Sequence, residues 1–264
     1  MREWRVFPLV MCLTMAVAVP VRSQGTTTAS PAPKADEIVG RMLEHNRERL
    51  AALESYTTER TYRVEYHGTG GEHRAEIAVH AEYTRPDQKH LTIVSESGAK
   101  FLCEKVLRKL VQSEEEAVQN SNRQTTISPE NYKAELIGEE TVAFPDSPNG
   151  LKTWVLRVTP RVDNKFTYHG RVWISQDDYA IVRIQGEPAK APSWWTNRAH
   201  FDSRYLRRSG VWLPAQNVST THVRIGGEAI LTIDYGTYPV VTAHPVVQSA
   251  ERHNPAALEA SLNR

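Results

Sequence analysis

The sequence predicts a mainly β protein in which one large, strongly bent antiparallel sheet of about ten strands is covered on its apolar face by amphipathic helices. Segments in which apolar and polar residues alternate fill most of the chain after residue 60. Short turn sequences separate these segments, and short connections favour antiparallel hairpins because a parallel crossover needs a dozen or more residues. Two other stretches repeat their apolar residues with the period of a helix.

Composition narrows the possible functions. The chain has 264 residues, of which 40% are hydrophobic and 24% charged, with a formal net charge of +1. A disordered scaffold would have fewer apolar residues and a larger net charge. A nucleic-acid-binding protein normally shows a clear basic excess. We therefore expect a folded domain that does not bind nucleic acid.

The first 23 residues have the order of a cleavable secretory signal peptide. Positive charges in Met1–Arg5 precede an apolar run from Val6 to Val19, and the small residues Val21 and Ser23 precede Gln24. The apolar run is shorter than the roughly 20 residues that a membrane-spanning helix needs. We expect export and cleavage after a site near residue 23, with an uncleaved, membrane-anchoring signal as the alternative.

Cleavage would change both the charge and the cysteine content. Three arginines and one glutamate leave with residues 1–23, so the net charge changes from +1 to −1. Cys12 lies inside the apolar run, where it is not placed for lipid attachment. Cys103 would then be the remaining cysteine, so no internal disulfide can form. We expect it to be a small buried hydrophobic residue, because no histidine lies close in sequence to activate it.

Residues 24–35 are rich in Thr, Ser, Ala and Pro and are predicted to be a flexible linker. A helix is predicted from Asp36 to Leu53, with charged residues on the face opposite its apolar stripe. That stripe consists of Ile38, Val39, Met42, Leu43, Leu50 and Leu53.

Three strands are predicted next, around residues 62–66, 77–83 and 90–94, followed by a second helix over residues 101–118. The acidic run Glu114–Glu116 lies toward the end of this helix, and we expect it to form a solvated face. From residue 136 onward only strands are expected. They cover residues 136–142, 153–159, 166–175, 179–185, 200–207, 211–223 and 229–235.

No motif of a catalytic or metal site is found. Serine-hydrolase elbow, phosphate-binding loop and dinucleotide-binding sequences are absent from the sequence. Asp177–Asp178 lies between two strands and is interpreted as a turn. His67, His73, His80 and His90 alternate with charged residues and are interpreted as exposed. We expect no enzyme and no cofactor; a hydrolase that uses these histidines is the least favoured alternative.

The aromatic residues and the helices suggest an apolar cavity. Two amphipathic helices offer little surface with which to cover a ten-stranded sheet, so the space between them is expected to be incompletely filled. Trp194 and Trp195 lie in a proline-flanked loop, where they either plug the edge of the sheet or contact an apolar ligand.

Seven segments of the chain carry a resemblance to a known family: Phe101–Leu102, Val106–Leu110, Gly170–Ile174, Asp178–Arg183, Gly186–Lys190, Pro192–Thr196 and Trp212–Ala215. They resemble the LolA superfamily of periplasmic lipoprotein carriers, which includes LolB and the N-terminal domain of RseB. The resemblance covers roughly residues 36–240 and is closest to outer-membrane lipoprotein-sorting proteins. It implies an unclosed barrel with a helical lid, a cavity for acyl chains and a lid arginine, for which Arg41, Arg47 and Arg108 are candidates.

The resemblance implies a single domain over residues 36–243, followed by a tail of residues 244–264. We expect a soluble, monomeric periplasmic carrier of lipoprotein acyl chains or lipids that works in outer-membrane lipoprotein sorting. An inner-membrane exporter and an outer-membrane acceptor are the implied partners. The alternative is an RseB-like module that senses lipoproteins in envelope-stress signalling. Candidate residues of the cavity and its lid are Met42, Leu43, Leu50, Phe101, Leu102, Leu107, Leu110, Trp194 and Trp195.

Overall fold

The computed structural model describes residues 33–86, 88–119, 126–164, 166–190, 196–223 and 226–243. The predicted signal peptide, residues 24–32 of the predicted linker, Trp194, Trp195 and the predicted tail lie outside these ranges. None of the helices in the described ranges is long and apolar enough to cross a membrane.

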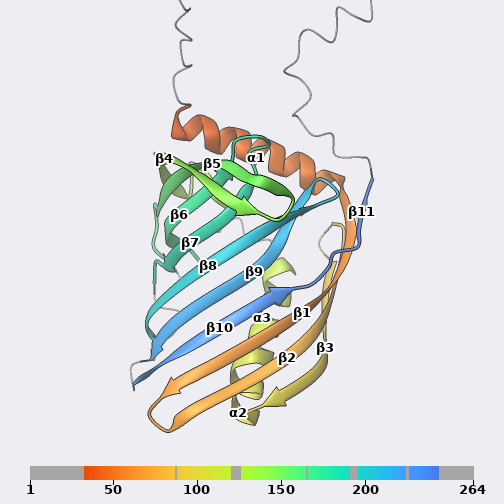
Figure 1. The fold of residues 1–264 in the computed structure, drawn as a ribbon, viewed down its shortest axis with the longest axis vertical. Coiled ribbons are helices and arrows are strands. Elements are labelled where there is room, and N and C mark those ends of the chain that lie inside the picture. Colours follow the sequence, from red (N-terminus) through yellow and green to blue (C-terminus); the bar gives the residue numbers. More distant parts are fainter. Residues whose placement is uncertain are drawn as a thin grey trace, which may run out of the picture. The chain divides into compact units, whose positions relative to one another are not determined.

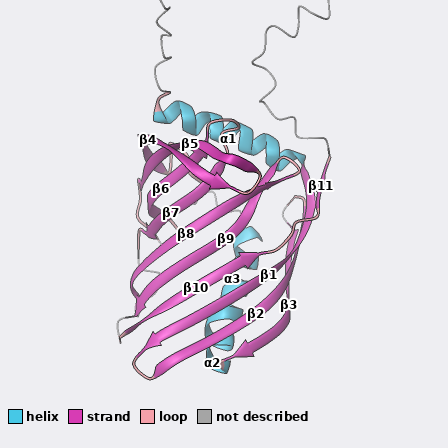
Figure 2. Cartoon of the chain, in the orientation of Figure 1, coloured by secondary structure: helices cyan, strands magenta, loops and turns pink. Residues whose placement is uncertain are grey.

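A single antiparallel sheet dominates the fold, as Figures 1 and 2 show. Its order is β3-β2-β1-β10-β9-β8-β7-β6-β5-β4, with β11 added to β1. Within the described residues the edge strands β3 and β4 do not pair, so the sheet does not close into a barrel. The strands are β1 (Leu53–Gly68), β2 (Gly71–Thr84), β3 (Gln88–Gly98), β4 (Tyr132–Phe144), β5 (Ser147–Pro160), β6 (Tyr168–Ser175), β7 (Ile181–Pro188), β8 (Thr196–Arg208), β9 (Val211–Val223), β10 (Gly227–Tyr235) and β11 (Val240–Thr242).

The predicted fold class is confirmed, with one strand more than the approximate count. Alternation explains why these segments form strands: in β2, the side chains of Ala75, Ile77, Val79 and Ala81 are buried and their neighbours are not. The predicted turn at Asp177–Asp178 is also confirmed between β6 and β7.

Glycine pairs and β-bulges allow the strong bend of the sheet. Gly170 on β6 lies opposite Gly186 on β7, and a Cβ on Gly170 would lie only 2.8 Å from the Gly186 Cα. Gly68 and Gly227 form a similar pair between β1 and β10. Ladder irregularities interrupt β2–β3, β4–β5, β6–β7 and β8–β9. Such bulges increase local twist and bend the strand that carries them.

Helix α1 (Ala35–Ala52) covers one half of the apolar face. Its buried residues Ile38, Val39 and Met42 pack against a core that includes Leu156 and Ile174 of the sheet. Each of these apolar side chains contributes about 1.5–3 kcal/mol through its removal from water.

A second helical segment covers the other half. It consists of α2 (Lys100–Leu102), a π-helical turn η1 (Cys103–Leu107) and α3 (Arg108–Gln119), and in Figure 1 it lies behind β1 and β2. Leu102, Leu107 and Val111 pack against β1, β2 and β10. Cys103 is buried in the same core, which confirms the prediction made for it.

A buried ionic cluster fixes α3 to the sheet. Arg60, whose side chain is 1% exposed, lies with Nη1 2.6 Å from Glu114 Oε1, and Lys89 Nζ lies 2.5 Å from the same oxygen. The Tyr62 hydroxyl donates to Glu114 Oε2 at 2.7 Å, and the Arg60 guanidinium stacks 4.8 Å from the centre of the Tyr235 ring. The expectation of a solvated acidic face is therefore wrong for Glu114.

The position of Glu114 along the helix explains this correction. It follows the buried residues Leu107 and Val111 by seven and three positions, so it faces the sheet. Burial alone raises the pKa of Glu114, but the charges of Lys89 and Arg60 outweigh that effect and the pKa is lowered. Glu114 is thus an ionised carboxylate between two buried cations.

Replacing Glu114→Gln should lower the free energy of unfolding by about 3 kcal/mol, because it leaves two cations buried without their counter-ion. Urea unfolding at neutral pH, followed by circular dichroism, measures the change. Glu115→Gln is the matched control, since Glu115 makes a contact of 3.6 Å with the exposed His90. Equal losses in both variants would contradict the role of Glu114.

The same cluster predicts a pH dependence of stability. Because the pKa of Glu114 is lowered in the folded protein, the unfolded chain takes up this proton first as the pH falls. The contribution of Glu114 is complete above its ordinary pKa of 4.5 and is lost as the pH falls through the lower folded value. Unfolding curves between about pH 6 and pH 3 should show a smaller loss of stability in Glu114→Gln than in the wild type.

Candidate functional site

A cavity of about 410 Å³ lies between α1 and the apolar face of the sheet. Helix α1 forms one side, and residues of β6 to β9 form the other. The lining residues are Met42, Leu43, Asn46, Arg49, Thr126, Ile127, Tyr168, Ala180, Ile181, Ile184, Tyr205 and Trp212.

The lining is mainly apolar and aromatic. Met42 and Leu43 project from α1 toward Ile181 and Ile184 of β7, with which they share one core cluster. Burial raises the pKa of both Tyr168 and Tyr205, so their phenol groups remain uncharged. A small concave site with few polar groups is suited to an apolar ligand.

Arg49 is the buried charge of this site. Its side chain lies on α1 with 6% of the residue exposed, and Nη1 donates a hydrogen bond of 2.8 Å to the carbonyl oxygen of Asp178. Burial lowers the pKa of Arg49, while the charges of Asp178 and Glu48 act in the opposite direction. A guanidinium stays protonated in proteins, so α1 carries a fixed positive charge at the cavity.

The β6–β7 turn connects three elements around the cavity. The Asp178 carbonyl binds Arg49, and its carboxylate Oδ2 accepts a hydrogen bond of 2.7 Å from Trp212 Nε1 on β9. The next residue, Tyr179, has a left-handed φ of 54° and stacks on His45 of α1 with a centroid distance of 5.5 Å. This turn therefore ties the end of α1 to the sheet.

The structure places the predicted cavity and lid residues in different environments. Met42 and Leu43 line the cavity. Leu102 and Leu107 belong to the second helical segment and are buried against β1, β2 and β10, and Leu110 packs beside them. Leu50 and Phe101 are each 52% exposed and do not line the cavity.

The candidate lid arginines do not hold α1 to the β6–β7 turn. Arg41 is exposed, with its guanidinium 5.9 Å from the Tyr179 ring centre, and Arg47 is also exposed. Arg108 lies on α3 and pairs with Glu96 at 2.7 Å. The arginine that makes this contact is Arg49, which lies seven residues after Met42 and so on the same helix face.

The residues on the sheet side of the cavity are not among those predicted from the sequence. Tyr168, Ile181, Ile184 and Tyr205 come from three different strands. Within the described ranges, no group of three or more His, Cys, Asp or Glu residues could hold a metal ion.

Replacing Arg49→Met should loosen α1, because it removes the bond to Asp178 and keeps a side chain of similar length. Amide hydrogen exchange in residues 35–52 should become about tenfold faster, as expected for the loss of about 1.5 kcal/mol from a charged hydrogen bond. Exchange in β1 and β2 should not change. Arg47→Met is the control, and a similar acceleration in that variant would contradict the role of Arg49.

No family model matches the chain, and a search of curated proteins gives no match. Several solved structures are similar to it. A DUF1329 family protein from Desulfovibrio piger is 13% identical with a TM-score of 0.40, and the match covers 83% of this chain and 98% of that one. A LolA superfamily protein from Nitrosomonas europaea is 13% identical with a TM-score of 0.34, covering 81% and 96%.

A putative outer membrane lipoprotein-sorting protein domain from Vibrio parahaemolyticus is 12% identical with a TM-score of 0.38, and the match covers 80% of this chain and 94% of that one.

Proposed function

We propose that this protein reversibly binds acyl chains of lipids or lipoproteins in the cavity beneath α1 and acts as a non-catalytic carrier. The observation that carries this proposal is an apolar and aromatic cavity of about 410 Å³ that has a helix as one wall. A helical wall can move away from a sheet without breaking any strand pairing, which would open the cavity.

The energetics suit capture and release. Each buried methylene contributes about 0.8 kcal/mol, so about ten methylenes would gain about 8 kcal/mol. The loss of translational and rotational freedom costs at least about 4 kcal/mol, which leaves at most about 4 kcal/mol from the chain itself and therefore a weak net affinity. A carrier needs such an affinity because it must pass its cargo to an acceptor.

The attachment of α1 supports a reversible opening. Besides its apolar packing and the contacts of His45 and Arg41 with the Tyr179 ring, α1 is tied to the β6–β7 turn by the bond from Arg49 to the Asp178 carbonyl. Hydrogen bonds of charged groups contribute about 1.5–3 kcal/mol, a cost that contact with cargo or a partner can offset.

The chemistry of the lining supports binding without catalysis. Among the described residues that border the cavity there is no carboxylate, histidine or cysteine. The polar groups are those of Asn46, Arg49 and Thr126 together with the aromatic hydroxyl and indole groups, and none forms a pair of nucleophile and general base.

The setting of this function follows from the N-terminal sequence. Residues 1–23 would direct the protein to the periplasm, an aqueous compartment in which acyl chains need a carrier that shields them from water. An inner-membrane exporter would supply the cargo and an outer-membrane acceptor would receive it. In an RseB-like module, the same cavity would sense lipoproteins and pass the signal to a partner protein.

Replacing Leu43→Glu should weaken the binding of a fluorescent palmitoyl probe at least about tenfold, because it places a charge in the apolar cavity. Leu50→Glu is the matched control on the same helix, where the side chain is exposed, and it should change binding less than about twofold. Circular dichroism and thermal unfolding check that both variants fold.

The proposal fails if the wild type takes up no palmitoyl probe, or if Leu43→Glu and Leu50→Glu bind it equally well. Native mass spectrometry of the protein isolated from cells provides a second measurement, in which a carrier retains lipid.

A further inference from the structure

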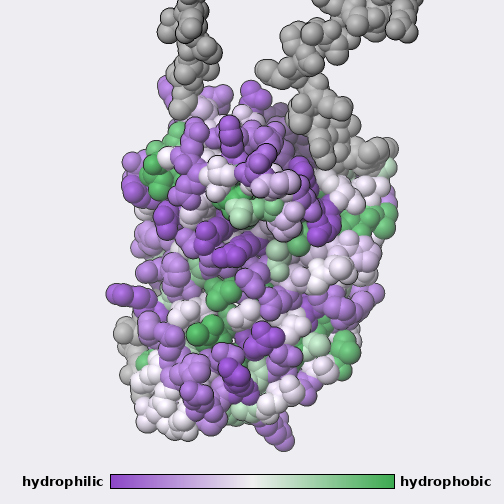
Figure 3. Space-filling view, viewed as in Figure 1, coloured by the Kyte–Doolittle hydropathy of each residue, from purple (hydrophilic) through white to green (hydrophobic). Residues whose placement is uncertain are grey.

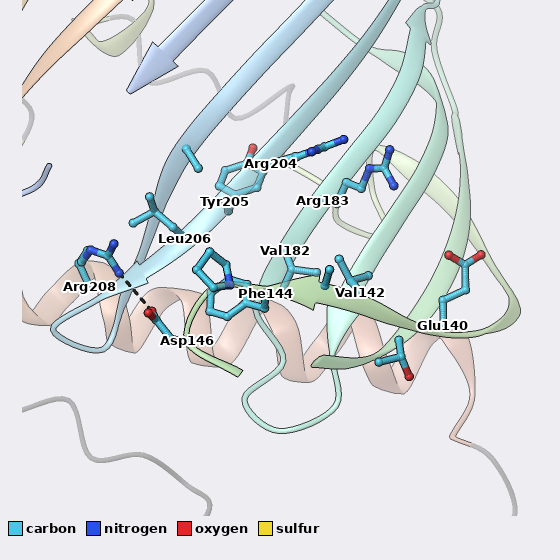
Figure 4. Close-up of a pocket in the computed structure, with 14 residues that line it drawn as sticks. Glu140, Val142, Phe144, Asp146, Val182, Arg183, Arg204, Tyr205, Leu206 and Arg208 are labelled. Carbon is cyan, nitrogen blue, oxygen red and sulfur yellow. Dashed lines mark hydrogen bonds and ion pairs between the residues drawn. The ribbon is translucent and has the colours of Figure 1, made fainter. Parts of the chain in front are cut away.

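A second and larger pocket, of about 720 Å³, lies under the far end of the β4–β5 hairpin. We name it the flap pocket, because residues 140–146 of this hairpin pass over β7 and β8 (Figure 4). Its lining residues are Glu140, Thr141, Val142, Ala143, Phe144, Pro145, Asp146, Val182, Arg183, Arg204, Tyr205, Leu206, Arg208 and Ala215.

The flap pocket lies on the face of the sheet opposite α1. Leu156 and Ile174 belong to the core beneath α1, whereas Val155 and Trp173, which alternate with them, belong to a cluster with Val182. Neighbouring residues of a strand point to opposite faces. The flap pocket is therefore separate from the proposed acyl-chain cavity, although Tyr205 borders both.

One part of the flap pocket is apolar. Val142, Phe144 and Val182 gather at its centre in Figure 4, and Leu206 lies beside them. Phe144 also packs on Trp212, with ring centres 5.2 Å apart. The side of the sheet shown in Figure 3 otherwise has only small, separate hydrophobic patches among polar residues. A covered apolar group on such a face can accommodate an apolar chain.

The charges of the flap pocket balance in number once Asp202, which pairs with two of its arginines, is counted, so a preference for an anion depends on where the charges lie. The lining includes three arginines, Arg183, Arg204 and Arg208, and two carboxylates. Glu140 accepts a hydrogen bond of 2.8 Å from Trp173 Nε1, and Asp146 pairs with Arg208 at 3.2 Å. Arg183 is occupied by Asp202, which it binds through Nε at 2.9 Å. The carboxylates of the pocket are thus already paired within the described residues.

Arg204 is the guanidinium left available. Its side chain is 57% exposed, and its nearest ion pair among the described residues is with Asp202 at 3.8 Å. Asp202 already accepts hydrogen bonds from Arg183 and from Gln185 at 2.9 Å. In Figure 4, Arg204 and Arg183 lie on one side of the apolar group. A ligand whose anionic group lies beside Arg204 can therefore place its apolar chain beneath the flap.

We propose that the flap pocket binds a single-chain anionic amphiphile, whose chain packs on Phe144 and Val182 and whose anionic group pairs with Arg204. A fatty-acid carboxylate and a lysophospholipid phosphate share this chemistry. The volume lies within the range of about 300–1,000 Å³ that is typical of small-molecule sites. The Asp146–Arg208 pair is half exposed and therefore weak, so the flap can lift to admit the chain.

Photolabelling of the whole chain with a dodecanoate that carries a diazirine at its chain end tests this proposal. Peptide mapping should find adducts in residues 140–146, or around Val182 and Leu206. Arg204→Gln should reduce this labelling about tenfold, as expected for the loss of a charged hydrogen bond. Arg198→Gln, an exposed arginine on the same strand, is the matched control and should leave labelling within about twofold.

Three competitors identify the ligand chemistry. Dodecyl phosphate or unlabelled dodecanoate should displace the probe; the one that acts at the lower concentration identifies a phosphate or a carboxylate head. Dodecanol and inorganic phosphate should each displace it at least about tenfold less well, because each lacks one half of the recognised chemistry. Adducts on residues 42–49 report the cavity beneath α1 independently.

The proposal is overturned if no adduct forms at the flap pocket, or if Arg204→Gln and Arg198→Gln label equally. Displacement by inorganic phosphate alone would show a simple anion site, and displacement by dodecanol as effective as that by dodecanoate would show a neutral apolar site. Both results also overturn it. None of these outcomes depends on labelling beneath α1, so the two sites are tested separately.

Discussion

The open sheet has one large apolar face that must be covered, and the rest of the structure depends on how this is done. Helix α1 covers the half formed by β4 to β7, and the second helical segment covers the half formed by β1, β2 and β10. Each cover is also tied by a buried charge, Arg49 in α1 and Glu114 in α3. Because two short helices cannot fill the whole width of a bent sheet, space remains beneath α1, and there the candidate binding site is found.

The two pockets lie on opposite faces of the same strands and are joined by direct contacts. Phe144 borders the flap pocket and packs on Trp212, whose indole donates to Asp178. The carbonyl of Asp178 holds Arg49 and with it α1. A displacement of the flap would therefore change the packing of Trp212, which also borders the cavity beneath α1. Packed side chains and hydrogen bonds of this kind are among the contacts that can carry coupling between two sites.

The alternation of apolar residues predicts the strands and the two helical covers, because local periodicity reflects burial directly. It also identifies Met42 and Leu43, the helix side of the cavity. The sheet side could not be predicted, because Tyr168, Ile181 and Tyr205 meet only through the pairing order of distant strands. Arg49 and Glu114 could not be predicted for another reason: charged residues are expected to be exposed, whereas both face the sheet and are compensated by distant partners. Arg49 is buried, and the Glu114 side chain is 25% exposed.

Within the part of the chain that the structure describes, β3 and β4 are edge strands of the sheet, and strands at such edges can recruit further chains into aggregates. Strand β4 counters this with a bulge at Gly138 and with the exposed charges of Lys133, Glu135 and Glu139. At the other edge, the ladder of β3 is irregular near Val79 of β2. The edges of the open sheet thus carry features that oppose polymerisation. Removing the charges of β4 is expected to lower the solubility of the protein more than its free energy of unfolding.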